Sequence, residues 1–412
     1  MHADKQPAVA LFATNDPRNY SGGRYHALIM AYALSHAGFA VTVYTDHVPA
    51  FDADLAPLAE RPPRFVLTRD FRSDIEVEPQ DWVVLTPTGI FMPGYYEAAT
   101  DYAAAAGARL ALINFESANW YNAVSPHPRD ARLWDGWRRA CLDGALVLSS
   151  ARTSLEQARE FYRSPHAEIR HDVWQPPINS PLATRFDGLP RRDLVVCFVR
   201  PSDPHKGAHD LLALPPDTLA GLELALVAGR EVDATFVKAL EARHGPAGCT
   251  VTLHTRISDA DKFRLLSQAR LLLFPTWFEG YGYPPIEAAW CGTPTACYAL
   301  PVLQETVGRI AGFAPVGDAE ALGRVARQLL AAPPAVGALR AAVRPLADFA
   351  LRAEALADLL TRHASVMPAR PARGFSSLLG PVSRTRPREP GVADRPPLPA
   401  YPWHLLAVRT LA

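Results

Sequence analysis

The chain has 412 residues, which is too long for one ordinary hydrophobic core and is typical of two domains. Its 42 basic and 42 acidic residues give a formal net charge of +0, so the charge balance carries no sign of a nucleic-acid-binding protein. Hydrophobic residues make up 49% of the chain and charged residues 20%, which fits a soluble globular enzyme.

Cysteine usage and hydropathy indicate the compartment. The five cysteines are odd in number and form no C-x-x-C pair, so we expect buried free thiols and neither disulfides nor a zinc site. No run approaches the ~20 apolar residues that a membrane span needs. The first residues show no secretory signal pattern. The sequence therefore predicts a cytoplasmic protein.

The first half of the chain alternates short apolar runs with helical patterns. The expected strands cover residues 8–13, 40–44, 82–86, 110–114 and 145–148, and the expected helices cover 25–37, 96–106 and 151–162. Apolar runs of this length between helices indicate strands that are buried on both faces, as in a parallel sheet.

The second half repeats this rhythm. Its expected strands are 194–199, 223–228, 250–254, 271–274, 295–298 and 312–314, and its expected helices are 208–213, 234–244, 259–269, 284–290 and 319–331. Two such series predict two doubly wound α/β domains, at 1–178 and 179–346. The link between them is expected in the proline-rich segment 175–181.

A helix and a tail are expected after the second domain. Residues 347–366 have a helical pattern, whereas 367–412 begin with a segment rich in Pro, Arg and Gly that is expected to be poorly ordered or draped on the surface. The apolar end, 401–411, could dock on this protein, on a partner or on a membrane surface. Packing on the protein itself is the preferred interpretation.

Two carboxylates mark the most informative stretch, Phe-Glu-Gly-Tyr-Gly-Tyr-Pro-Pro-Ile-Glu at 278–287. A buried strand is expected before it, and the prolines suit the start of a helix. The amides of a helix N-terminus favour an anion such as a phosphate. Glu279 and Glu287 would repel that phosphate if they faced it, so they are better suited to accept hydrogen bonds from the hydroxyl groups of a sugar and a ribose.

Two cations follow the expected strand 194–199. Arg200 and Lys206 lie on the loop Arg-Pro-Ser-Asp-Pro-His-Lys-Gly, which leads into a helix. Ligands of open α/β sheets bind at the carboxyl ends of strands, where a guanidinium and an ammonium can clamp a diphosphate. The alternative is a pair of surface cations with no ligand.

The stretch 278–287 has Phe-Pro before it and Cys-Gly-Thr-Pro after it, and the match continues over 303–308. It resembles the Glu-x7-Glu signature of retaining glycosyltransferases with the GT-B fold, especially glycosyltransferase family 4. The resemblance implies an α/β fold of GT-B architecture, in which two Rossmann-like domains face a cleft. The first domain would hold the acceptor and the second the nucleotide sugar. The C-terminal tail lies outside the resemblance.

The resemblance also assigns roles to residues. Glu279 would lie by the donor sugar, Glu287 would hold the ribose hydroxyls, and Arg200 with Lys206 would hold the diphosphate. The remaining donor-binding residues would act largely through backbone groups, and they are Gly22, Gly23, Ile257, Gly280, Tyr281, Gly282 and Tyr283. Many family members carry a histidine after the expected strand 110–114. Here Glu116 is its nearest substitute, with a solvated loop acid as an equal alternative.

Two Asp-x-Asp patterns, at 52–54 and 259–261, formally match the metal motif of the other large glycosyltransferase fold. Ser258 and Asp261 form a capping box pattern, with Asp259 adding negative charge to the first helical turn, which explains the second pattern without a metal. The first lies in a polar loop. We therefore expect neither a metal ion nor a cofactor.

The resemblance implies a retaining hexosyltransferase that moves a hexose from a nucleotide diphosphate sugar to a glycan, a lipid-linked glycan or a small molecule. Through its tail it could associate peripherally with the inner face of a membrane. One alternative is a non-enzymatic binding or partner subunit of the same fold. Another is a nicotinamide-dependent oxidoreductase, against which the missing G-x-G-x-x-G pattern speaks.

Overall fold

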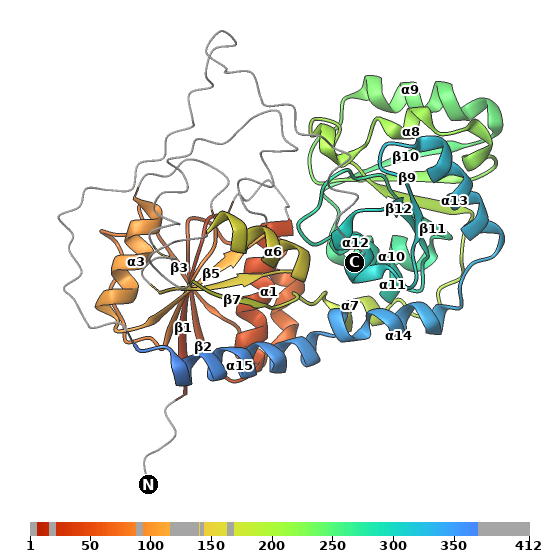
Figure 1. The fold of residues 1–412 in the computed structure, drawn as a ribbon. Coiled ribbons are helices and arrows are strands. Elements are labelled where there is room, and N and C mark those ends of the chain that lie inside the picture. The colour runs from red at the N-terminus through yellow and green to blue at the C-terminus, as the bar shows by residue number, and fades with distance from the viewer. Residues whose placement is uncertain are drawn as a thin grey trace.

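The computed structural model describes residues 6–15, 22–87, 94–115, 140, 144–162 and 169–369. Two parallel sheets, each with helices packed against it, lie side by side in the molecule (Figure 1). This arrangement confirms the predicted α/β class with two doubly wound sheets.

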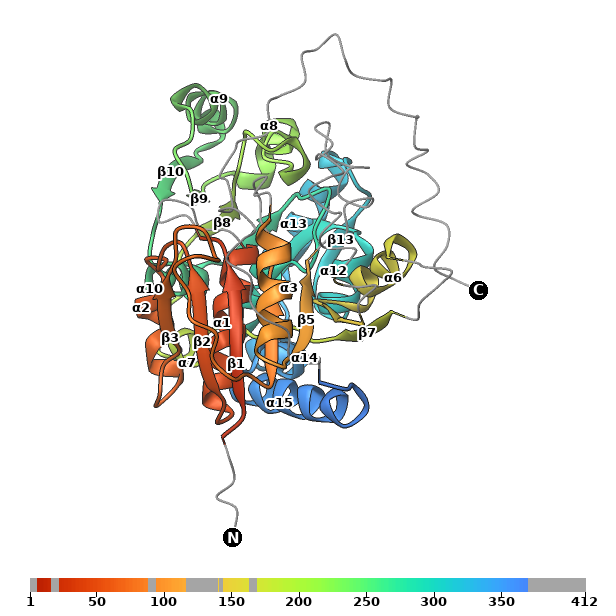
Figure 2. The same cartoon turned by 90° about the vertical axis from the view of Figure 1, so that its left-hand side faces the viewer.

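The first sheet has seven strands in the order β3-β2-β1-β4-β5-β6-β7, and all its pairs are parallel. Figure 2 shows β3, β2 and β1 in this order at one edge. The strands are β1 (Ala8–Ala13), β2 (Ala40–Thr45), β3 (Arg64–Leu67), β4 (Trp82–Leu85), β5 (Arg109–Asn114), β6 (Leu146–Ser149) and β7 (Arg170–Val173). The α-helices between them are α1 (Gly22–His36), α2 (Asp52–Leu55), α3 (Tyr95–Ala105) and α6 (Arg152–Phe161).

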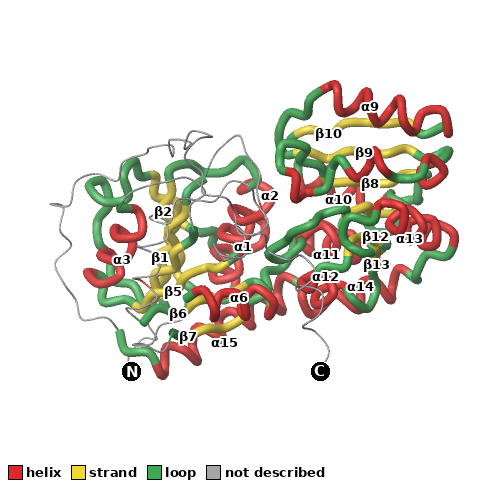
Figure 3. Tube along the Cα trace, turned by 45° about the horizontal axis from the view of Figure 1, so that its top comes forward, coloured by secondary structure: helices red, strands yellow, loops and turns green. Residues whose placement is uncertain are grey.

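The second sheet has six strands in the order β10-β9-β8-β11-β12-β13, also all parallel (Figure 3). The strands are β8 (Leu194–Phe198), β9 (Glu223–Ala228), β10 (Thr250–Thr255), β11 (Leu271–Phe274), β12 (Thr295–Tyr298) and β13 (Gly312–Ala314). The α-helices are α7 (Ser180–Thr184), α8 (Asp210–Ala213), α9 (Ala234–His244), α10 (Asp259–Gln268), α11 (Tyr283–Trp290), α12 (Pro301–Val307) and α13 (Ala319–Ala331).

The central strands are apolar on both faces because helices cover both sides of each sheet. In β1, Val9 and Leu11 join the core that contains α1, whereas Ala10 and Phe12 join the core on the opposite face. The edge strand β3 and the edge strand β7 are only partly buried and carry polar residues. β7 has no apolar run, and the run in β3 is only three residues long, from Phe65 to Leu67, which explains why the sequence pattern predicted neither strand.

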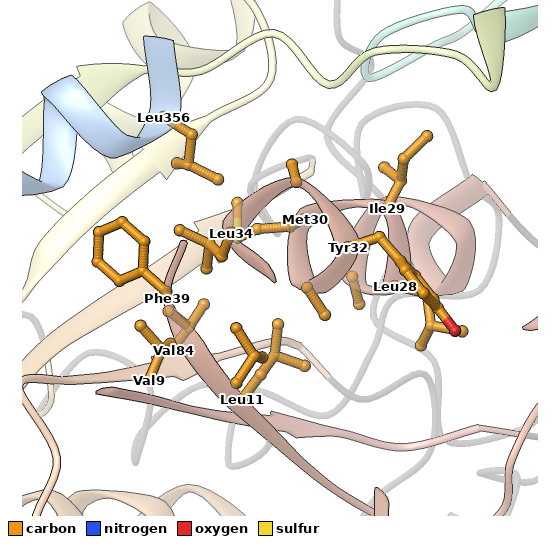
Figure 4. Close-up of a cluster of buried hydrophobic side chains, with 14 of the residues drawn as sticks. Val9, Leu11, Leu28, Ile29, Met30, Tyr32, Leu34, Phe39, Val84 and Leu356 are labelled. Atoms are coloured by element: carbon orange, nitrogen blue, oxygen red, sulfur yellow. The ribbon is translucent and has the colours of Figure 1, made fainter. Parts of the chain in front are cut away.

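The last described helices connect the second domain back to the first. The sequence predicted one helix over 347–366. This helix is α15 (Phe349–Val366), and the structure adds a helix that was not predicted, α14 (Val336–Ala347). The two are separated at Asp348, whose side chain accepts a hydrogen bond from the Leu351 amide at the start of α15. α15 packs on α1, and Leu356 contributes to the same core as Leu34 and Met30 (Figure 4).

The described residues also bear on the sequence-based expectations for the thiols and the tail. Cys197, Cys249, Cys291 and Cys297 are free and buried, as expected, whereas Cys141 lies outside the described residues. Burial raises the pKa of the Cys197 thiol to about 12. The tail from residue 370 onward lies outside the described residues as well, and among the helices within them none is long and apolar enough to cross a membrane.

His26 of α1 is buried among aromatic rings, 5.1 Å from Phe115 and 5.4 Å from Trp174 between ring centroids. Its Nε2 has no hydrogen-bond partner among the described residues. Burial lowers the pKa of His26 from 6.5 to about 3, because a charged imidazolium is poorly solvated there. The native state thus holds this ring neutral.

We predict that acid destabilises the protein partly through His26. The unfolded chain binds a proton there below pH 6.5 while the folded chain does not, so stability present above pH 6.5 is lost as the pH falls. Each pH unit below that point removes up to ~1.4 kcal/mol at this site. Urea unfolding at pH 7 and pH 5 should show a smaller loss for His26→Phe than for the wild type, and equal losses would contradict the prediction.

Candidate active site

Lys206 and Glu279 meet where β8 and β11 end. The two strands are direct neighbours in the parallel sheet, so their carboxyl ends open at the same edge. Lys206 Nζ lies 2.7 Å from Glu279 Oε1, although 73 positions separate the residues in the chain. The Thr276 hydroxyl donates to the same carboxylate oxygen at 3.1 Å. The structure therefore brings together two predicted site residues and adds Thr276, which the sequence analysis did not single out.

Gly207 allows the loop after β8 to pack closely against the loop after β11. Its φ of 64° lies in the left-handed region, and a Cβ atom at this position would lie 1.7 Å from the carbonyl oxygen of Pro275. The Trp277 amide also donates to the His205 carbonyl at 2.8 Å. Only glycine allows this backbone approach, which sets the position of Lys206 against Glu279.

Arg200 lies at the same edge but in a different environment. Its guanidinium pairs with Asp203 at 3.0 Å, and about a third of its side chain is exposed. It lines a pocket of about 580 Å³ between the loops after β8 and β9, together with Ser202, Gly229 and Arg230. Arg200 and Lys206 thus both lie at the carboxyl edge of β8, each paired with an acid.

Glu287 lies in a very different environment from Glu279. It is on α11 and only 2% exposed, and its Oε1 lies 2.7 Å from Lys262 Nζ. Lys262 also pairs with Asp259 at 2.8 Å. Burial raises the pKa of Glu287, and the ammonium opposes that effect. Burial alone would lower the pKa of Lys262, but attraction to Asp259 and Glu287 raises it on balance.

This buried cluster was not predicted. Ser258 caps α10 as expected, because its hydroxyl accepts from the Asp261 amide at 3.1 Å. Asp259, however, does more than add charge to the first helical turn, since its buried side chain holds Lys262. The signal was present in the sequence as a lysine three positions after an aspartate, in a chain with few lysines.

The side chain of Tyr281 is buried, and that of Tyr283 is partly buried. Their ring centroids lie 5.2 Å apart, and Tyr283 packs edge-on against Tyr25 of α1 at 5.3 Å. Burial raises the pKa of both hydroxyls. Gly282 ends the loop with a φ of 88°, where a side chain would meet Leu303. The loop from Gly280 to Tyr283 can therefore contact a ligand mainly through its backbone and the exposed part of Tyr283.

The first domain reaches this loop from the other side. Gly22 and Gly23 begin α1, and a Cβ atom on Gly22 would lie 3.8 Å from the Tyr283 ring. Ser150, after β6, donates to the Gly280 carbonyl at 3.1 Å. The predicted glycine pair and the predicted loop are therefore neighbours across the domain boundary.

A carboxylate from the second domain also caps a helix of the first. Glu305 on α12 accepts hydrogen bonds from the Arg152 amide at 2.7 Å and the Thr153 amide at 2.9 Å, both in the first turn of α6. These amides have no partner within their own helix, so an acid there is favourable. This contact fixes α12 against the first domain beside the loop that carries Glu279.

Two other predicted sites have different outcomes. Ile257 is half-buried between β10 and α10 and packs on the second-domain core, following Arg256, whose φ of 53° is unusual for a residue other than glycine. Glu116 lies outside the described residues. Of the two Asp-x-Asp patterns, Asp54 accepts from the Asp259 amide at 3.2 Å, so the two patterns contact one another.

Comparisons with known proteins find similar sequences. Residues 192–332, about a third of the chain, match the family model described as Glycosyl transferases group 1. O-antigen chain mannosyltransferase B from Escherichia coli is 35% identical over 233 residues, which cover 52% of this chain and 59% of that protein. The aligned part therefore spans less than two thirds of this relative.

Solved structures share the fold. Sucrose-phosphate synthase from Thermosynechococcus elongatus matches with a TM-score of 0.68 at 17% identity, covering 88% of this chain and 100% of that one. HepE from Anabaena, solved in complex with UDP and glucose, matches with a TM-score of 0.64 at 16% identity, covering 87% and 100%. These likenesses confirm the predicted GT-B architecture. The family-model match and the mannosyltransferase relative confirm the resemblance to glycosyltransferases that the motif at 278–287 indicated.

We predict that Gly207→Ala destabilises the protein by ~2 kcal/mol or more, because the methyl group would collide with Pro275 in a strained backbone conformation. Gly221→Ala is a matched control. Gly221 has a φ of 69° but no neighbour within 4 Å of an added Cβ, so only the conformational strain applies. Equal losses in urea unfolding for the two variants would show that the contact with Pro275 is unimportant.

Proposed function

We propose that this chain is a retaining glycosyltransferase of family 4 that transfers a hexose from a nucleotide diphosphate sugar. The observation that carries the proposal is the pairing of Lys206 with Glu279 at the carboxyl edge of the second sheet. Ligands of open α/β sheets bind at this edge. The group 1 glycosyltransferase match covers both residues.

Lys206 is suited to hold the diphosphate and Glu279 at the same time. An ammonium has three N–H donors, and the contact with Glu279 uses only part of this capacity. Arg200 and the amides at the start of α1, Gly22 and Gly23, offer further positive groups to the phosphate oxygens. These positive groups on the protein would stabilise the negative charge of the diphosphate, which a metal ion does in other enzymes. We therefore propose a metal-independent reaction.

These groups would act mainly in the transition state. As the bond between the anomeric carbon and the diphosphate breaks, negative charge grows on the leaving phosphate, where Lys206 and Arg200 stabilise it. The acceptor hydroxyl attacks from the same face, forms the new glycosidic bond and gives its proton to the departing phosphate, which retains the anomeric configuration. Glu279 orients the sugar hydroxyls and opposes the positive charge that develops on the sugar ring.

The acceptor proposed is a glycan or lipid-linked glycan. The curated relative is named an O-antigen chain mannosyltransferase, which supports a hexose donor and a saccharide acceptor. Buried free thiols support a location in a reducing compartment, the cytoplasm. Attachment to the inner membrane face through the tail stays a prediction.

A thermal-shift panel of UDP, GDP, ADP, dTDP and NAD without added metal tests the donor site. A ligand at about 100 times its dissociation constant stabilises the fold by ~2.7 kcal/mol. We expect stabilisation by one nucleoside diphosphate and none by NAD. If no diphosphate stabilises folded protein, the donor site is refuted and the non-enzymatic subunit becomes the better interpretation.

Lys206→Ala should weaken the binding of that nucleoside diphosphate by ~1.5–3 kcal/mol, the range for hydrogen bonds to charged groups. Lys238→Ala, which removes an exposed lysine of α9, serves as the control. Isothermal titration should show an affinity loss of roughly 10- to 150-fold for Lys206→Ala and no loss for the control. An unchanged affinity in Lys206→Ala would exclude the proposed clamp.

Glu279→Gln should lower turnover about 100-fold or more, because it removes charge from the reacting sugar while keeping the shape of the side chain. Release of UDP from UDP-glucose and of GDP from GDP-mannose measures this rate. Diphosphate binding should change much less than turnover. Glu241→Gln, on the exposed face of α9, is the control, and wild-type turnover in Glu279→Gln would contradict the assigned role.

A further inference from the structure

A lysine lies buried between two acids beside the proposed donor site. Lys262 Nζ lies 2.8 Å from Asp259 Oδ1 and 2.7 Å from Glu287 Oε1, and all three residues are buried. The Phe263 ring lies 4.6 Å from the ammonium, and the Tyr25 ring of the first domain lies 5.5 Å from it. Burying a charged lysine costs desolvation free energy, so the ammonium must be stabilised by partners of opposite charge.

The contact with Lys262 uses only one oxygen of Glu287. Oε1 accepts from the ammonium, whereas Oε2 makes no hydrogen bond to any described residue. The Glu287 residue as a whole is only 2% exposed. Lys262 thus fixes one oxygen of Glu287, and the other oxygen has no hydrogen bond to a described residue.

We propose that Lys262 is a positioning residue, which keeps Glu287 ionised and turned so that Oε2 accepts hydrogen bonds from the ribose hydroxyls of the donor. This inference rests on the proposed function, because it assumes that a nucleotide binds beside Glu287. It adds that the preference of the site for a ribose depends on a residue that does not touch the nucleotide.

The physical reason is the cost of an unpaired buried carboxylate. Without the ammonium, Glu287 and Asp259 would face each other as two buried acids, and Glu287 would take up a proton. A protonated carboxyl is a much weaker acceptor than a carboxylate, and it would be free to rotate. Lys262 prevents both changes, and the two rings beside it leave the ammonium little room to move.

Lys262→Met tests the proposal, since methionine fills a similar volume without the charge. The probes are UDP and GDP, each compared with its 2′,3′-dideoxy form by isothermal titration. Wild type should bind the ribose form of the better probe about 10-fold or more tightly than the dideoxy form. In Lys262→Met this ratio should fall to within about twofold, through weaker binding of the ribose form alone. A purely structural role would weaken both forms equally.

A second variant covers the case in which Lys262→Met does not fold. Lys262→Met combined with Asp259→Asn leaves one buried negative charge, the same net charge as the wild-type cluster, and should lose the ribose preference as well. Lys262→Arg retains a cation and should keep most of the preference. Lys238→Met, on the surface of α9, should leave it unchanged.

The outcomes separate the two proposals. If none of UDP, GDP, ADP and dTDP binds wild type, the proposed function is refuted and this inference with it; if only ADP or dTDP binds, the ribose comparison is made with ADP and its 2′,3′-dideoxy form, and a site specific for dTDP, which lacks the 2′-hydroxyl, refutes the inference. If a nucleotide binds but wild type does not distinguish ribose from dideoxyribose, the function stands and the inference is refuted. A wild-type preference that persists in Lys262→Met also refutes the inference.

Discussion

The candidate site depends on the adjacency of two parallel strands. β8 and β11 are neighbours in the second sheet, and parallel strands end at the same edge, so the loops that follow them must meet. The backbone contact between Gly207 and Pro275 then sets how closely they meet. Lys206 and Glu279 form their ion pair because of this backbone arrangement. A different strand order would leave the same two residues far apart.

The loop after β11 contacts residues of both domains. Its tyrosines point into the core, with Tyr283 packed against Tyr25 of the first domain, while its backbone accepts a hydrogen bond from Ser150. Glu305 adds a contact with the first turn of α6 close by. A loop held from two domains can keep its backbone in place while its polar groups face the space between them. This rigidity suits a site that must hold a flexible substrate.

Glu279 and Glu287, which are eight positions apart, lie in different electrostatic environments. Glu279 pairs with a lysine whose side chain is partly exposed, so a ligand can reach both groups. Glu287 pairs with a lysine that is itself buried and fixed by Asp259. The first pair can be rearranged by a substrate at small cost, since its groups can still contact water. Separating the buried pair of Lys262 and Glu287 costs much more free energy, because each charge would be left buried without a partner. This contrast supports a reactive role for the first pair and a positioning role for the second.

The sequence by itself determined the central strands, the α/β class and the Glu279 loop. These features depend on local patterns, namely apolar runs that are buried on both faces and a glycine–proline segment that must turn into a helix. The edge strands β3 and β7 escaped prediction because β7 has no apolar run and the run in β3, from Phe65 to Leu67, is only three residues long. Helix α14, which precedes Asp348, was also not predicted.

Only the tertiary structure decided the partners of the charged residues. Lys206 could pair with any acid brought to the edge of the sheet, and its choice of Glu279 follows from strand order. Lys262 and Glu287 lie 25 positions apart and meet because α10 packs beside α11. Ion pairs between distant segments are set by how elements pack, and packing depends on the whole chain. The sequence therefore identified the acids of the site, whereas the fold determined which lysine each acid pairs with.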